Sequence, residues 1–152
     1  MNNTLINQAK TILQEEDDLA AIYNLVSLLF NETEDINWLG LYLYKNNELV
    51  LGPFQGKVAC THIKINNGVC GTSFYLNQIL NIENVHEFKG HIACDSASNS
   101  ELVLPINYLE KRIGVLDIDS TSFNRFSKDD EDTFNEITKL IGQRIKNINI
   151  QI

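Results

Sequence analysis

Residues 101–119 of the chain read ELVLPINYLEKRIGVLDID. Two runs dense in apolar residues, Glu101–Asn107 and Arg112–Asp119, flank a short segment, Tyr108–Lys111, that suits a turn. Runs of this kind are typical of strands in the middle of a sheet, and two runs that follow each other across a tight turn pair as a hairpin. The stretch therefore predicts an antiparallel hairpin at the centre of a sheet.

The residues before this hairpin predict further strands and a short helix. Ile36–Tyr44 alternates along its length and is rich in aromatic residues. Residues 46–47, both asparagine, mark a turn, and the apolar run Leu49–Leu51 follows, so a second hairpin is expected. After it, Thr61–Ile65 predicts a short strand and Cys70–Asn77 a short helix.

Two longer helices are expected, one before and one after these strands in the sequence. The first begins near Asp17 and Asp18, whose carboxylates suit the positive end of a helix dipole, and the second follows the capping-box pair Ser127 and Asp130. Apolar residues recur behind both starts at helical spacing: Leu19, Ile22, Leu25, Val26 and Leu29 in the first helix, and Phe134, Ile137, Ile141, Ile145 and Ile148 in the second. This order predicts an α+β fold, a central, largely antiparallel sheet flanked by N- and C-terminal helices, with residues 1–152 forming a single domain.

The composition excludes several classes of protein. A chain of 152 residues with 43% hydrophobic and 21% charged residues fits an ordinary globular domain. Its net charge of -8 would repel a phosphate backbone, so no nucleic-acid partner is expected. No apolar run is long enough to cross a bilayer, and the N-terminus lacks the apolar core of a signal peptide. We therefore expect a cytoplasmic protein with no membrane partner.

The three cysteines, Cys60, Cys70 and Cys94, each stand next to alanine or glycine. In a reducing compartment an odd number of cysteines argues against a permanent disulfide framework. Any one of them alone is better explained as a buried filler, whereas three together favour thiol chemistry. Cys94 belongs to Asn81–Ser100, a long polar stretch without strand or helix periodicity, which we interpret as a functional loop.

A second group of candidates is acidic. Asp117 and Asp119 point to the same side of their predicted strand, and Glu101 opens the partner strand. Carboxylates that converge and are shielded from water raise one another's pKa, so that one stays protonated near neutral pH, as a general acid must. The alternatives remain open that both aspartates lie on a solvated face or only fix a turn before Ser120.

Aromatic and histidine side chains complete the candidates. Trp38 and Tyr42 share a strand face, with Gly40 between them to leave space for a ligand, although such a pair is more often simply core. His62 and His91 stand near cysteines, which raises the alternative of a zinc site. The spacing offers no close pair of ligands, so we predict no metal and no other cofactor.

Five motifs go beyond these generic signals. They are NWLGLY at 37–42, LGPFQGKVAC at 51–60, GVCGT at 68–72, HIACD at 91–95 and GVLDIDS at 114–120. Together they resemble the free methionine-R-sulfoxide reductases, which are enzymes built on a GAF domain. The likeness extends from about Asn37 to Phe126 and includes all three cysteines of that family.

The resemblance implies a role for each candidate residue. Cys94 matches the cysteine that attacks the sulfoxide, and Cys60 and Cys70 match the candidates for resolving it, with Cys70 also open as the attacking thiol. An acidic cluster in the family holds the sulfoxide oxygen and the substrate amine, and it is matched by Glu101, Asp117 and Asp119. The wall around the methyl group is matched by Trp38 and Tyr42. Glu101 or Asp119 would donate the proton. Thioredoxin is then the expected reductant, and the loop carrying Cys94 the expected lid.

Two other functions remain as alternatives. A GAF domain can serve as a sensor of a small ligand without catalysis, since this fold hosts many functions. A thiol redox switch would form the same disulfide without turning over a substrate. Pairing of two copies into a homodimer through the terminal helices is left open by the sequence.

Overall fold

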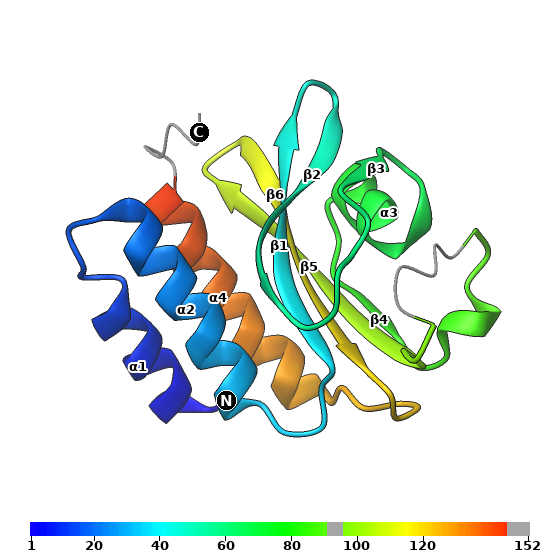
Figure 1. Ribbon diagram of the computed structural model, residues 1–152, viewed down its shortest axis with the longest axis horizontal. Coiled ribbons are helices and arrows are strands. Elements are labelled where there is room, and N and C mark those ends of the chain that lie inside the picture. Colours follow the sequence, from blue (N-terminus) through cyan, green and yellow to red (C-terminus); the bar gives the residue numbers. More distant parts are fainter. Residues whose placement is uncertain (91–95, 146–152) are drawn as a thin grey trace.

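The computed structural model describes residues 1–90 and 96–145. Within them, six strands form one sheet in the order β3-β2-β1-β6-β5-β4, in which every neighbouring pair is antiparallel. The strands are β1 Trp38–Lys45, β2 Glu48–Gln55, β3 His62–Lys64, β4 Leu80–Ile82, β5 Ser100–Tyr108 and β6 Lys111–Ser120. The predicted hairpin of residues 101–119 is confirmed as β5 and β6, and it lies near the centre of the sheet (Figure 1).

Helices cover both faces of this sheet. Three of them, α1 (Asn3–Ile12), α2 (Asp18–Glu32) and α4 (Lys128–Ile145), pack together on one face (Figure 1). On the other face lies α3 (Gly68–Leu76), and a short 3-10 helix, η1 (Val85–Glu87), follows β4. The predicted α+β class with flanking terminal helices is confirmed. Among the described residues, none of the helices has the length and apolarity needed to span a membrane.

Strand alternation divides the interior into two cores. Leu41, Leu104 and Leu116 face the three-helix layer and are fully buried in the larger core. Their neighbours along the strands point the opposite way, so that Tyr42 and Val115 join the smaller core under α3. Because successive side chains of a strand alternate between faces, one set of strands builds both cores.

The strand register determines which polar residues share the face under α3. Trp38 lies opposite Asp119, and Asp119 lies opposite Glu101. Asp117 lies one step along the same face, opposite Gly40 of β1. Directly opposed residues of antiparallel strands project to the same side. The predicted convergence of the three carboxylates is therefore confirmed. They lie on β5 and β6, and Trp38 joins them from β1 of the other hairpin.

Local sequence signals set the ends of several elements. The Asp17 carboxylate accepts a hydrogen bond from the Ala20 amide at the start of α2. Ser127 and Asp130 exchange side-chain to backbone hydrogen bonds of 2.8 and 3.1 Å before α4, so the predicted capping box is confirmed. Residues 46–47 both adopt positive φ, 52° and 65°, as a tight hairpin turn between β1 and β2 requires.

Several elements differ from the prediction. Helix α1 was not predicted, because its polar sequence shows only a narrow apolar stripe that packs on α2 and α4. Strand β4 occupies the start of the stretch predicted to be a loop. Strand β2 continues through Pro53. Its register with β1 shifts there by a bulge, so the ladder does not need the backbone N–H that proline lacks. Leu19, expected on the buried face of α2, is 40% exposed, and Ile148 lies outside the described residues.

Gly142 provides a test of the packing between α4 and the sheet. In an ordinary helix, replacing glycine by alanine stabilises by about 1 kcal/mol. Here an added Cβ would lie 2.1 Å from the Asn107 carbonyl oxygen of β5. We expect Gly142→Ala to lower the free energy of unfolding by about 1–3 kcal/mol, as overpacking does, measured by urea denaturation.

The neighbouring exposed residue Gln143 supplies the matched control. Gln143→Ala should change the free energy of unfolding by less than about 0.5 kcal/mol, because its side chain lies on the outer face of the helix. A Gly142→Ala protein as stable as the wild type would show that α4 does not press on Asn107.

Candidate active site

A cavity lies between the face of the sheet under α3 and the first turn of that helix. It is lined by six of the residues that the sequence singled out: Trp38, Tyr42, Cys70, Glu101, Asp117 and Asp119. None of the described side chains that line it is a lysine, arginine or histidine. The cavity is therefore acidic, and it suits a ligand that carries a positive charge or donates protons.

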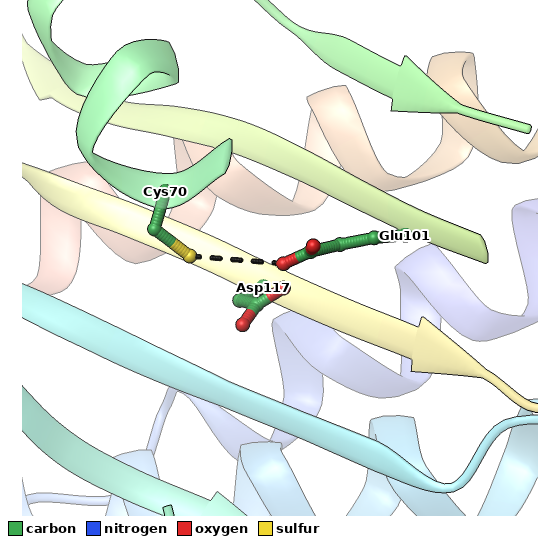
Figure 2. A group of neighbouring side chains, drawn as sticks. All are labelled: Cys70, Glu101 and Asp117. Carbon is green, nitrogen blue, oxygen red and sulfur yellow. Dashed lines mark hydrogen bonds between the residues drawn. The ribbon is translucent and has the colours of Figure 1, made fainter. Parts of the chain in front are cut away.

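Three of these side chains meet at the floor of the cavity. Glu101 of β5 and Asp117 of β6 are 7% and 6% exposed, and Cys70 reaches down to them from α3 (Figure 2). The Cys70 thiol donates to Glu101 Oε2 at 3.9 Å. The Cys70 sulfur and one carboxylate oxygen each from Glu101 and Asp117 all lie within 4.8 Å of one another. The helix and the sheet thus bring a thiol and two carboxylates to one point.

Burial in this cluster holds protons on two groups. The pKa of Glu101 is raised well above its usual value, mainly by burial and then by the charges of Asp117 and Asp119. The pKa of Cys70 is also raised, again mainly by burial and then by Asp117 and Glu101. Glu101 therefore meets the condition for a general acid near neutral pH. Cys70 is a protonated thiol, which donates hydrogen bonds but is a poor nucleophile.

The aromatic residues form a wall and also belong to the smaller core. Trp38 and Tyr42 are each 2% exposed, and their rings stack with centroids 5.9 Å apart. Phe54 of β2 also stacks on Trp38, with ring centroids 5.4 Å apart. The expectation that Gly40 leaves space for a ligand is wrong. An added Cβ there would lie 2.6 Å from the Trp38 ring, so the glycine makes room for that ring.

Cys60 lies outside any strand, in the loop between β2 and β3. Two residues just before it, Val58 and Ala59, line the cavity. Cys60 is disulfide-bonded, whereas Cys70 is a free thiol. Cys94 lies outside the described residues.

Ser98 is a cavity residue that the sequence analysis missed. It is 5% exposed, and its hydroxyl accepts a hydrogen bond from Asn37 Nδ2 at 3.1 Å. Because the oxygen accepts from Asn37, its own hydrogen points elsewhere, and it finds no acceptor among the described residues. The first turn of α3 was also missed: residues 67–69 line the cavity, and Asn67 makes no side-chain cap. Both contacts arise from tertiary packing, and no local motif marks them.

One of the two histidines behind the zinc alternative lies away from the cavity. His62 points to Glu48, at 2.7 Å on the exposed side of the sheet, and does not line the cavity. His91 lies outside the described residues. Cys70, Glu101 and Asp117 are close enough to approach one cation, but two of them hold protons that a metal would have to displace. That no metal is needed stays a prediction.

Comparison with known proteins agrees with this geometry. The family model of the GAF domain matches residues 7–145. The chain is 56% identical over 117 residues to the free methionine-R-sulfoxide reductase of Escherichia coli, which covers 77% of this chain and 71% of that protein.

Solved structures are similar over nearly the whole chain. The Staphylococcus aureus fRMsr in complex with its substrate has a TM-score of 0.88 and 43% identity, covering 94% of both chains. The free methionine-R-sulfoxide reductase of Neisseria meningitidis in complex with its substrate has a TM-score of 0.87 and 35% identity, covering 92% of this chain and 85% of that one. The chain therefore belongs to the GAF domain family and, within it, to the free methionine-R-sulfoxide reductases.

Proposed function

We propose that this protein reduces free L-methionine-R-sulfoxide to L-methionine through a cycle of cysteine thiol, sulfenic acid and disulfide. The observation that carries the proposal is the buried acidic cluster beneath the aromatic wall. Glu101 holds a proton there, while Asp117 and Asp119 line the same cavity. A sulfoxide oxygen leaves poorly unless it is protonated or strongly hydrogen-bonded, and this cluster can supply both.

The same cavity fits a free amino acid. The substrate ammonium would face the carboxylates of Asp117 and Asp119, in a site whose described lining has no cationic side chain to compete. The methyl group on sulfur would rest against Trp38 and Tyr42, since aromatic faces suit a thioether or sulfoxide. The substrate carboxylate would take its hydrogen bonds from Ser98 and from the amides of the first turn of α3. An enclosed ammonium and carboxylate leave no exit for a peptide chain.

The chemistry would begin with attack of the Cys94 thiolate on the sulfoxide sulfur. Oxygen passes formally to the cysteine, which becomes a sulfenic acid, and methionine is released, with Glu101 protonating the departing oxygen. The Cys60 thiol then attacks the sulfenic sulfur, a disulfide forms and water leaves. A dithiol, which we expect to be thioredoxin, reduces that disulfide by exchange.

The described thiols support this division of work. Cys70 is buried, free and held protonated beside Glu101, so it fits a hydrogen-bond donor better than an attacking thiolate. Cys60 lies in an accessible loop and is disulfide-bonded, which fits the resolving thiol. We therefore assign resolution to Cys60 and only a polar role in the cavity to Cys70.

Consumption of NADPH through thioredoxin and its reductase tests the activity. Free L-methionine-R-sulfoxide, its S epimer and a peptide-bound sulfoxide would be supplied in parallel. We expect sustained turnover of the free R epimer alone, abolished in Cys94→Ser. If no sulfoxide is turned over, the GAF domain acts as a ligand sensor or as a redox switch, and the proposal is wrong.

Glu101→Gln tests the proton donor. We expect kcat to fall by about 10²–10⁴-fold, the usual contribution of a general acid. Wild-type activity should fall as pH rises through the raised pKa of Glu101, because the carboxylate cannot donate, and the variant should lack this decline. Glu110→Gln, in the exposed turn after β5, is the matched control and should keep wild-type kcat.

The stability of the same variant gives an independent readout. Above the ordinary pKa of a glutamate, the unfolded chain has lost its proton while folded Glu101 retains it, so native stability falls as pH rises. Glutamine avoids this cost. We expect Glu101→Gln to raise the melting temperature at neutral pH while it lowers activity. A variant that is both less active and less stable at neutral pH would contradict the raised pKa.

Ser98→Ala tests the missed cavity residue. The hydroxyl would donate to the substrate carboxylate, and a hydrogen bond to a charged group contributes about 1.5–3 kcal/mol. We expect KM for the free sulfoxide to rise by roughly tenfold or more, with a smaller effect on kcat. Ser122→Ala, whose hydroxyl donates to Asp35 outside the cavity, is the control. An unchanged KM in Ser98→Ala would remove Ser98 from the substrate site.

A further inference from the structure

The polar atoms of the aromatic wall donate hydrogen bonds to the loop that carries Cys60. The indole Nε1 of Trp38 donates to the carbonyl of Lys57 at 3.0 Å. The hydroxyl of Tyr42 donates to the carbonyl of Cys60 itself at 2.9 Å. Residues 56–61, here called the Cys60 loop, are thus held from beneath by two side chains of β1.

A backbone hydrogen bond fixes the far end of this loop, while its first residues are exposed. Thr61 accepts from the Leu51 amide at 3.0 Å at the far end of the loop. Residues 56–58 are exposed, and Val58 is 87% exposed. The hydroxyl of Tyr42 therefore contacts the backbone of Cys60, which is the residue of this loop that forms a disulfide.

We propose that Tyr42 is a positioning residue for Cys60, holding its backbone where the thiol meets the sulfenic acid of Cys94. This inference rests on the proposed function, which assigns resolution to Cys60. It gives the tyrosine two separable parts: the ring forms the wall of the substrate cavity, and the hydroxyl sets the resolving step.

The resolving step is sensitive to backbone position. The Cys60 sulfur attacks the sulfenic sulfur of Cys94, the S–S bond forms, the S–O bond breaks, and the departing oxygen takes up the thiol proton and leaves as water. The product disulfide requires the two Cα atoms to lie within about 4.4–6.8 Å. A loop that drifts by a few ångströms would spend most of its time outside this range.

The hydroxyl is suited to a constant structural role. Burial, and then the negative charge of Asp117, raise the pKa of Tyr42, so the phenol keeps its proton and remains a donor. Tyr42 is 2% exposed, and water does not readily replace the bond to Cys60. The hydrogen bond should therefore persist across the working pH range.

Tyr42→Phe separates the two parts, because it keeps the ring that stacks on Trp38 and removes only the hydroxyl. Fully reduced enzyme would be mixed with free L-methionine-R-sulfoxide in the absence of any reductant. Methionine released, thiols lost and the sulfenic acid trapped by dimedone would be followed over one turnover by rapid quench and mass spectrometry.

We expect the ratio of disulfide formation to methionine release to fall by about five- to tenfold in Tyr42→Phe, as the loss of one hydrogen bond would produce. The trapped sulfenic acid should then accumulate on Cys94, as it should in Cys60→Ser. Tyr44→Phe is the matched control. It also removes a tyrosine hydroxyl from β1, but that hydroxyl donates to Asn47 on the surface. Its ratio should equal that of the wild type.

The outcomes distinguish the two proposals. A wild-type ratio in Tyr42→Phe overturns the positioning role while the reductase cycle stands. An equal loss of both rates, with the ratio unchanged, also overturns it, because the hydroxyl would then support the site as a whole. Wild-type enzyme that releases no methionine overturns the proposed function, and the positioning role with it.

Discussion

The register between β1, β6 and β5 is the constraint on which both the core and the site depend. Opposed residues share a face, so Glu101, Asp119 and Trp38 form one row. Ile118 and the residues opposite it, Leu39 and Leu102, point to the helices. A slip of one residue in β6 would turn its aspartates into the apolar core and bring Ile118 into the cavity. Burying unpaired charges costs several kcal/mol, so the large core enforces the register that assembles the site.

The acidic cluster lowers the stability of the fold, and packing elsewhere in the sheet offsets this loss. Glu101 and Asp117 are buried beside a third carboxylate, no described residue of the lining is cationic, and holding a proton on Glu101 lowers the free energy. The strands that bear these carboxylates are anchored by fully buried leucines on their other face. A stable core on one side of the sheet thus allows an unfavourable arrangement of charge on the other, a common trade between stability and activity.

How much could be predicted from the sequence follows from the range of the interactions involved. Alternation within a strand was enough to place Asp117 and Asp119 on one face, the predicted hairpin added Glu101, and local caps were enough to begin α2 and α4. The position of Ser98 could not be predicted, because Asn37 lies 61 residues away in the chain. The role of Gly40 was misread for the same reason, since the ring that fills its space depends on a rotamer and on Phe54.

The aromatic wall contacts both the acidic cavity and the Cys60 loop. Trp38 and Tyr42 line the cavity and donate hydrogen bonds to the Cys60 loop, so one pair of side chains touches both the acidic cavity and the loop that carries a disulfide-bonded cysteine. Burial further distinguishes the two cysteines, because Cys70 is kept protonated within the acidic floor while Cys60 lies half-buried in a loop outside that floor. The surroundings of the two cysteines differ for a physical reason, since the buried carboxylates that keep a proton on Cys70 would suppress formation of a thiolate at any thiol placed among them.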